Sequence, residues 1–325
     1  MRILVTGSSG HLGDALVRVL GADAHDVTGL DVLASGSTSV VGSVADRACV
    51  RACVAGMDAV LHAATLHKPH VGSHAREAFV ETNVMGTLTL LEEAVAAGVG
   101  RFVFTSTTST FGRALTPPPG APAAWITEDV VPVPRNVYGV TKTAAEDLCE
   151  LVHRDHGLPC VVLRTSRFFP EGDDRDHVRA AYDDANVKVN ELLYRRVDLA
   201  DVVSAHRRAL ERAPAIGFGR YIVSATTPFT PDDLPALPVD APSVLRRRCP
   251  DYEAVFAPRG WTMFGSIERV YVNARARREL GWSPRYDFGH ALDRLAAGED
   301  PRSPLARAIG AKGYHRVPTG PCTTR

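Results

Sequence analysis

Residues 2–13 decide the fold of this chain and read RILVTGSSGHLG. The strand-like run Arg2–Thr6 leads into three glycines, and a helical pattern follows them. Such glycines permit a tight turn that brings the backbone close to a diphosphate, and the start of the helix offers free N–H groups to its charge. A glycine trio alone is weak evidence, but this one follows a strand and opens a helix, which is the context of a dinucleotide-binding turn.

The second predicted strand, near residues 26–31, ends at Asp31. This carboxylate follows the glycine turn by roughly 20 residues, a position from which it accepts hydrogen bonds from the adenosine ribose and repels a 2′-phosphate. The sequence therefore predicts NAD rather than NADP as the cofactor.

Short β-rich runs alternate with helical patterns through the first half of the chain, which predicts a parallel sheet covered on both faces. Strands are expected near residues 2–6, 26–31, 39–42, 58–63, 101–106 and 160–165, and helices near 11–21, 46–55, 75–98 and 137–156. We therefore predict an α/β fold, a Rossmann-type doubly wound parallel sheet with a smaller C-terminal substrate-binding domain. The expected division is 1–166 for the NAD-binding Rossmann domain, 167–298 mainly for the substrate-binding domain, with some chain returning to the sheet, and 299–325 for a loosely held tail.

The composition narrows the class of protein. Over 325 residues, 37 basic side chains balance 37 acidic ones, which argues against nucleic acid or an anionic membrane as the main partner. No apolar run approaches the roughly 20 residues that span a bilayer, and no export segment precedes the first strand. The six cysteines are scattered, as suits a reduced compartment. We expect a cytoplasmic protein with a small-molecule substrate.

Tyr138 and Lys142 lie four residues apart, which places a phenol and an ammonium on one face of a predicted helix. An isolated phenol has a pKa near ~10 and is a poor base at neutral pH. A nearby ammonium stabilises the phenolate and lowers that pKa, so the pair can move a proton. We predict Tyr138 as a general acid/base and Lys142 as its partner.

Further motifs occur in order along the chain. They are Leu61-His-Ala-Ala64, Asn83-Val-Met-Gly-Thr87, the hydroxyl-rich run Phe104–Gly112, Arg195–Asp201, and Ala276–Pro284, which ends in Leu-Gly-Trp-Ser-Pro. With the glycine turn, Asp31 and the Tyr138/Lys142 pair, they make the chain resemble the extended short-chain dehydrogenase/reductase family, the NAD-dependent epimerase/dehydratase group. The resemblance covers residues 2 to about 290. It implies hydride transfer at a secondary alcohol or ketone, and we expect a homodimer.

The resemblance also assigns roles to residues. The third catalytic residue is a hydroxyl five positions before Gly112, which is Thr107, with Ser106 as the alternative. Cofactor contacts are implied at Gly7, Ser9, Gly10, His11, Leu12, Gly13, Asp31, Ser43, Val44, Ala63, Ala64, Asn83, Ser106, Tyr138, Lys142 and Ser166. One departure is Ser43, which stands where the family often has an aspartate. Another is Thr108 with Ser109, which replace the acidic pair of the sugar dehydratases and argue against water elimination.

The segment Glu171–Tyr194 is short and acidic, with seven carboxylates against three basic groups, and is a poor cradle for a diphosphate. We therefore expect a sugar-like or small polyol or keto substrate without a nucleotide. Candidate substrate contacts are His67, Lys68, His70, Thr108, Asn186 and Arg195. The histidine-rich loop 62–74 has no interleaved cysteine or carboxylate, so no metal is expected, and a plain polar loop is an equally good interpretation. The run Arg246–Arg248 is better read as solvated charge than as an anion site.

Two other functions remain open at this point. One is a nucleotide-sugar 4-epimerase with permanently bound NAD. The other is a non-catalytic NAD-binding regulatory protein, which the intact Tyr138/Lys142 pair disfavours.

Overall fold

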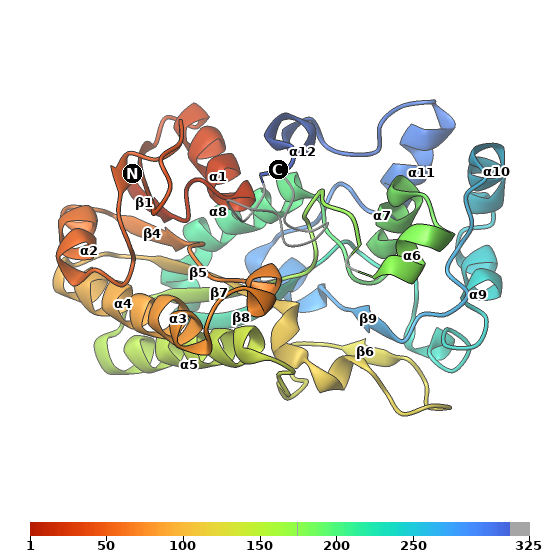
Figure 1. Ribbon diagram of the computed structural model, residues 1–325, viewed down its shortest axis with the longest axis horizontal. Helices are drawn as coiled ribbons and strands as arrows, with labels where there is room; N and C mark the ends of the chain where they lie inside the picture. The colour runs from red at the N-terminus through yellow and green to blue at the C-terminus, as the bar shows by residue number, and fades with distance from the viewer. Residues whose placement is uncertain (174, 313–325) are drawn as a thin grey trace.

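The computed structural model describes residues 1–173 and 175–312. Its centre is a parallel sheet of order β3-β2-β1-β4-β5-β7-β8 (Figure 1). The strands are β1 Arg2–Thr6, β2 Asp26–Asp31, β3 Val40–Val41, β4 Ala59–His62, β5 Phe102–Thr107, β7 Cys160–Thr165 and β8 Phe218–Val223. The strand order reverses at β1, so the carboxyl ends of β1 and β4 flank the crevice where ligands bind in such sheets. The predicted α/β class and doubly wound sheet are confirmed.

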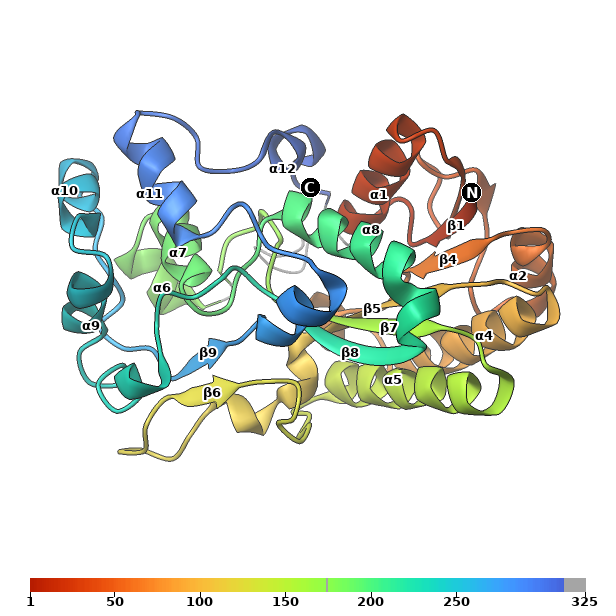
Figure 2. The ribbon, with the colours of Figure 1, turned by 180° about the vertical axis from the view of Figure 1, so that it is seen from behind.

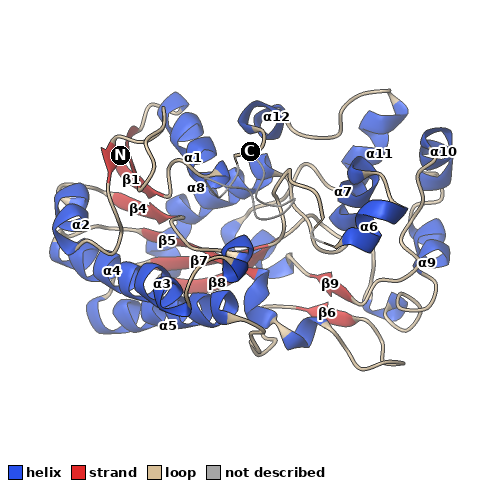
Figure 3. Ribbon diagram, viewed as in Figure 1, coloured by secondary structure: helices blue, strands red, loops and turns tan. Residues whose placement is uncertain are grey.

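Helices cover both faces of this sheet (Figure 3). One layer holds α1 (His11–Ala22), α8 (Leu199–Ile216) and α12 (Pro304–Ile309), which lie together in the view from behind (Figure 2). The other layer holds α2 (Arg47–Val54), α4 (Gly86–Ala96) and α5 (Val137–His156). The strands serve both layers because successive side chains point to opposite faces.

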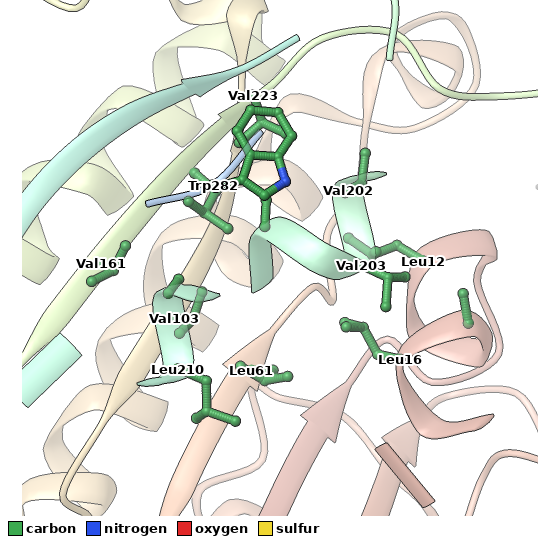
Figure 4. Packing of buried hydrophobic residues seen from close by; sticks show 14 of the residues in the cluster. Leu12, Leu16, Leu61, Val103, Val161, Val202, Val203, Leu210, Val223 and Trp282 are labelled. Carbon is green, nitrogen blue, oxygen red and sulfur yellow. The ribbon is translucent and has the colours of Figure 1, made fainter. Parts of the chain in front are cut away.

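The two layers enclose two hydrophobic cores. On β1, Ile3 and Val5 face the core under α1 and α8, whereas Leu4 faces the core under α4 and α5. Figure 4 shows the first core, where side chains of α1 and α8 meet those of β4, β5, β7 and β8 and Trp282. The Trp282 indole N–H donates to the Ser204 hydroxyl on α8 over 2.8 Å, which ties the distal chain to this layer.

The predicted helix over 75–98 is a helical stretch interrupted by one π-helical turn. It consists of α3 (Arg76–Phe79), the π turn Val80–Met85 and α4. A π turn closes hydrogen bonds one residue wider than an α-helix, so it accommodates an extra residue and re-aims its neighbours. The apolar period on either side hides this insertion from sequence analysis.

The rest of the described chain builds a second body of structure around its own core, beside the sheet. Its elements are β6 Ala124–Ile126, α6 Asp176–Ala181, α7 Asp184–Leu192, α9 Ala241–Arg248, α10 Tyr252–Phe256, β9 Arg269–Tyr271 and α11 Phe288–Ala296. Shorter turns are Lys68–Gly72, Thr108–Phe111, Arg113–Leu115, Pro231–Asp233, Ala257–Arg259 and Ala276–Leu280. Strands β6 and β9 pair in parallel. Strand β8 belongs to the main sheet, and α8 packs against that sheet. The boundary at residue 166 remains our proposal.

One expectation needs correction. Residues 299–312 are not a loose tail, because α12 packs against α1 and α8 and buries Ile309 in their core. The sequence did not suggest this short helix, because the last part of the chain is rich in glycine, proline and arginine. The remaining expected tail, 313–325, lies outside the described residues.

Candidate active site

A cavity of about 580 Å³ opens at the carboxyl edge of the sheet. The predicted cofactor residues that line it are Gly7, Ser9, Gly10, His11, Leu12, Gly13, Asp31, Ser43, Val44, Ala63, Ala64, Ser106 and Tyr138. They come from the ends of β1, β2, β4 and β5, from the residues after β3, and from the starts of α1 and α5. The parallel sheet thus gathers into one hollow residues that are far apart in sequence.

The glycine turn presents bare backbone to this cavity. Gly7 has a φ of +73°, and a Cβ added there would lie 2.7 Å from the Ala64 nitrogen. A Cβ on Gly13 would lie 1.9 Å from the Gly7 carbonyl oxygen. Neither position has room for a side chain, so the turn keeps the close approach that a dinucleotide diphosphate requires.

Asp31 ties the glycine turn to the end of β2. Its Oδ2 accepts the Ser9 N–H over 3.0 Å, and its Oδ1 accepts the Leu33 N–H over 2.9 Å. Each carboxylate oxygen has a second lone pair, so both can also accept a ribose hydroxyl. The geometry fits the ribose-binding role expected for this carboxylate.

Tyr138 stands at the first turn of α5, on the wall of the cavity. Asn136 caps this helix, since its Oδ1 accepts the Gly139 N–H over 3.0 Å. Burial raises the pKa of Tyr138 to about 12, and a hydrogen bond with the Thr107 hydroxyl offsets part of that rise. The predicted lowering of the phenol pKa is therefore wrong for the protein alone, because desolvation of the phenolate dominates.

Lys142 lies one turn further along α5 and is buried. Its Nζ is 3.8 Å from the centroid of the Phe104 ring. Burial lowers the pKa of Lys142 to about 7, against the opposing effect of the Glu146 carboxylate. The ammonium is thus only partly charged at neutral pH.

The two candidates for the third hydroxyl have different partners. Ser106 Oγ donates to Glu146 Oε1 over 2.5 Å, and Arg164 binds the same carboxylate through Nη2 over 2.7 Å. Thr107 instead bonds the Tyr138 phenol. The structure therefore favours Thr107 over Ser106 as the hydroxyl that works with Tyr138.

The sequence model of the NAD dependent epimerase/dehydratase family matches residues 3–221. The chain belongs to this family. Membership confirms the resemblance read from the motifs and the NAD dependence that it implied.

Two curated relatives show the range of the family. A dTDP-glucose 4,6-dehydratase from Streptomyces niveus is 38% identical over 193 residues, which cover 52% of this chain and 55% of that protein. A 2-alkyl-3-oxoalkanoate reductase from Stenotrophomonas maltophilia is 34% identical over 184 residues, which cover 54% of this chain and 53% of that protein. The chain therefore spans about half the length of these curated relatives.

The similarity of fold extends further than the similarity of sequence. A solved short-chain dehydrogenase/reductase superfamily protein from Agrobacterium tumefaciens, with bound NAD, matches at a TM-score of 0.66 and 25% identity. The match covers 95% of this chain and 99% of that one. The C-terminal half thus follows a family architecture although its sequence has diverged.

Three residues that the family resemblance placed at the cofactor lie outside the cavity lining: Lys142, described above, and Asn83 and Ser166. The Asn83 amide accepts the Leu66 N–H over 2.8 Å and donates to Thr141 Oγ1 over 3.0 Å, so it clamps the loop after β4 to α5. Ser166 Oγ donates to the Val223 carbonyl over 3.0 Å, between β7 and β8. Both side chains connect elements around the cavity through these hydrogen bonds and do not line it.

Of the predicted substrate residues, two line the cavity. His67 and His70 lie with ring centroids 4.7 Å apart, and the His67 N–H donates to His70 Nδ1 over 2.9 Å. Lys68 is exposed beside them, and Thr108 is buried in a short turn outside the lining. The pair His67/His70 is therefore the part of the histidine-rich loop that faces the cavity.

The other two predicted substrate residues serve the second core. Asn186 Oδ1 accepts the Thr262 N–H over 3.1 Å, which anchors α7 to the loop after α10. Arg195 forms ion pairs with Glu191 over 2.6 Å and Asp173 over 3.2 Å. Both side chains thus have partners within the protein itself.

Sequence analysis missed several residues of the cavity wall. Phe169 lies between His11 and His67, with ring centroids 5.7 and 5.6 Å away. Lys312 also lines the cavity, although it comes from the other end of the chain. No local pattern marks either residue, because the fold alone brings them to the sheet edge.

Residues 1–173 and 175–312 contain neither a metal-ligand cluster nor a membrane-spanning helix. No group of three or more histidine, cysteine, aspartate or glutamate side chains there could hold a metal ion. No helix in this part of the chain is both long and apolar enough to cross a membrane.

Proposed function

We propose that the chain is an NAD-dependent oxidoreductase that transfers hydride at a secondary alcohol or ketone of a sugar-like or small polyol or keto substrate. The observation that carries the proposal is that the Tyr138 phenol, bonded to Thr107, stands in the same cavity as the glycine turn and Asp31. When bound there, NAD accepts or returns the hydride. The residues of this chain handle the proton.

Tyr138 is better prepared as an acid than as a base. With its pKa raised to about 12, the phenol is protonated at neutral pH and can donate to the oxygen of a ketone as that oxygen gains charge. In the reverse direction the phenolate, formed once Tyr138 has lost its own proton, receives the hydroxyl proton of the substrate. Thr107 holds the phenol in place, and its hydroxyl provides a second contact for the reacting oxygen.

The charges of the second core support a substrate without a nucleotide. Glu191 is buried, and although burial alone would raise its pKa, the guanidiniums of Arg196, Arg195 and Arg167 lower it to about 2. These arginines are thus already engaged by an internal carboxylate. A diphosphate would have to break buried ion pairs to reach them, which is strongly unfavourable.

Two arginines of α9 are also paired. On α9, Arg246 binds Glu253 over 2.7 Å and Arg248 binds Asp233 over 2.8 Å. In Figure 1, α9 lies at the end of the molecule opposite the seven-stranded sheet. This supports the interpretation of Arg246–Arg248 as surface charge.

A nucleotide-sugar 4-epimerase with permanently bound NAD is the second candidate, favoured by the dehydratase relative that acts on dTDP-glucose. The first experiment is to denature the purified protein and assay the supernatant for NAD and NADH. Stoichiometric release supports a resident cofactor and hence the epimerase. Absence of cofactor, with reversible NAD binding and reduction of a keto substrate in a panel, supports a reductase or dehydrogenase. Reversible binding without turnover on any panel would favour the regulatory alternative.

We also infer a homodimer in the cytoplasm. The packed helices α4 and α5 and the π turn before α4 expose Val80, Met85, Val140 and Leu151, which an assembly through these helices would cover. The cysteines within the described residues are all free, in keeping with a reduced compartment. Light scattering on the wild type and on Met85→Glu tests the assembly, since a charge in that interface would produce monomers.

A further inference from the structure

The C-terminal end of the described chain crosses the start of α1. Ser303 caps α12, with its Oγ accepting the Ala306 N–H over 3.0 Å, and the Ser303 N–H donates to Asp198 Oδ2 over 3.1 Å. Ile309 is buried in the core of α1 and α8. A cap and a core side chain thus hold this segment against the cofactor half of the molecule.

The segment places Lys312 on α1. The Lys312 N–H donates to His11 Nε2 over 3.0 Å, and its ammonium donates to Asp14 Oδ2 over 2.5 Å. The side chain lines the 580 Å³ cavity beside Gly10 and His11. A positive charge from the far end of the chain therefore lies at the glycine turn.

No other lysine or arginine lines this cavity among the residues that the structure describes. The start of α1 contributes roughly half an elementary positive charge, which offsets only part of a diphosphate. A lysine at the same place supplies a full charge and three N–H donors. Among the described residues that line the cavity, Lys312 is the fixed cation available for that purpose.

Asp14 does not depend on Lys312 alone. Burial acts to raise the pKa of Asp14, but hydrogen bonds from Arg18, Lys312 and Ser37 outweigh it and lower the pKa. Arg18 Nε lies 2.8 Å and Ser37 Oγ 2.5 Å from Asp14 Oδ1. The carboxylate therefore keeps two partners if the ammonium turns toward a ligand.

We propose that Lys312 is a cofactor-binding residue whose ammonium bridges Asp14 and the diphosphate of the bound dinucleotide. The proposal rests on the cofactor site described above. It makes the C-terminal segment part of that site, and it differs from a simple tether between Lys312 and α1 in one respect. Loss of a tether would change the affinity of the cavity for every ligand equally. Loss of a phosphate contact would lower the affinity only for ligands that carry a phosphate.

Calorimetric titration of NAD, ADP and adenosine into the full chain separates the two. We expect Lys312→Met to lower the affinity for NAD and for ADP by about 10-fold or more and to leave the affinity for adenosine within about 2-fold. Only NAD and ADP carry the phosphates with which Lys312 would make a charge-assisted contact. Lys312→Arg should recover most of the affinity. The matched control is Arg307→Met, which removes a like charge from an exposed position of α12 and should change nothing.

Asp14→Asn provides the opposite test, because it frees the ammonium and should keep or strengthen NAD binding. If Asp14→Asn and Lys312→Met weaken NAD binding equally, Lys312 is a tether and the proposal is overturned. Unchanged ADP binding in Lys312→Met, or an equal loss of affinity for adenosine, would also overturn it. If Asp14→Asn does not fold by circular dichroism, the ligand series on Lys312→Met decides alone. A wild type that binds no NAD would instead refute the cofactor site itself.

Discussion

The ammonium of Lys142 lies 3.8 Å from the centroid of the Phe104 ring, and both side chains are buried. An aromatic face partly compensates a cation that has lost its water. Even so, burial dominates and lowers the pKa of Lys142 to about 7, so this lysine changes charge within the working pH range of the protein.

The first prediction concerns this ionisation. In the reductive direction Tyr138 stays protonated far above neutral pH, so an alkaline limb of kcat/KM near pH 7 belongs to Lys142. Its charge is present below that pH and is lost above it. Activity that needs the ammonium should therefore fall as the pH rises through about 7, and Lys142→Met should abolish the limb and lower the rate and NAD affinity at pH 6. A profile that is flat from pH 6 to 8.5 in the wild type would contradict this assignment.

The second prediction is that Tyr138→Phe lowers kcat by about 10²–10⁴-fold, the usual contribution of a positioned acid/base. Folding and NAD affinity should change little, because the ring remains and only the hydroxyl is lost. Turnover of the substrate found in the panel is the measurement. Tyr182→Phe, which removes a hydroxyl outside the cavity lining, is the matched control, and wild-type activity in Tyr138→Phe would exclude the proposed mechanism.

The third prediction concerns cofactor choice. Asp31→Asn should weaken NAD binding by about 10-fold and narrow its advantage over NADP, because the charged acceptor and the repulsion of a 2′-phosphate disappear together. Fluorescence titration of both nucleotides gives the two Kd values. Asp26→Asn at the exposed start of the same strand should leave both unchanged. A native preference for NADP would show that the cofactor assignment is wrong.

The fourth prediction concerns stability in acid. Burial, together with the charge of Lys142, lowers the pKa of His62 to about 3, and burial lowers that of His206 to about 4. Both are neutral in the fold and gain protons more readily when unfolded, so stability is full above pH 6.5 and falls as the pH drops. Urea unfolding should show a loss of about 2 kcal/mol per histidine by pH 4.5. His206→Gln should reduce this slope, while His156→Gln, at an exposed position, should keep it.

The fifth prediction addresses substrate size. Titration of the NAD-loaded protein with UDP, GDP and TDP should show no binding at micromolar concentration, because the arginines near the cavity are paired with buried carboxylates. Glu191→Gln, which releases those arginines, is the informative comparison if it folds. Micromolar affinity of the wild type for any of the three would restore the nucleotide-sugar epimerase as the favoured function.

Local structure could be predicted from the sequence where it depends on short spacing. The glycine turn, Asp31 and the Tyr138/Lys142 pair each lie within one strand-to-helix unit, so their geometry follows from the period of the local structure. The strands of the main sheet up to β7 follow from apolar runs for the same reason.

Prediction from the sequence failed where a partner comes from elsewhere in the chain. Asn186 bonds Thr262, and Lys312 reaches His11, across separations that no local pattern encodes. The direction in which the pKa of Tyr138 shifts was also missed. The sequence shows which charged residues are close along the chain, but not how completely water is excluded from the phenol.

The π turn at Val80–Met85 has a consequence for how this chain can change over time. Asn83 sits inside that turn and holds both the loop after β4 and α5. Deleting one residue from the turn would remove the residue that the wider π turn accommodates and leave a regular α-helix, in which side chains of the former turn point in new directions. Asn83 would then lose at least one of its two sets of hydrogen bonds, to the loop after β4 or to α5. Residues 80–85 must therefore keep their number for Asn83 to connect that loop with the helix that carries Tyr138.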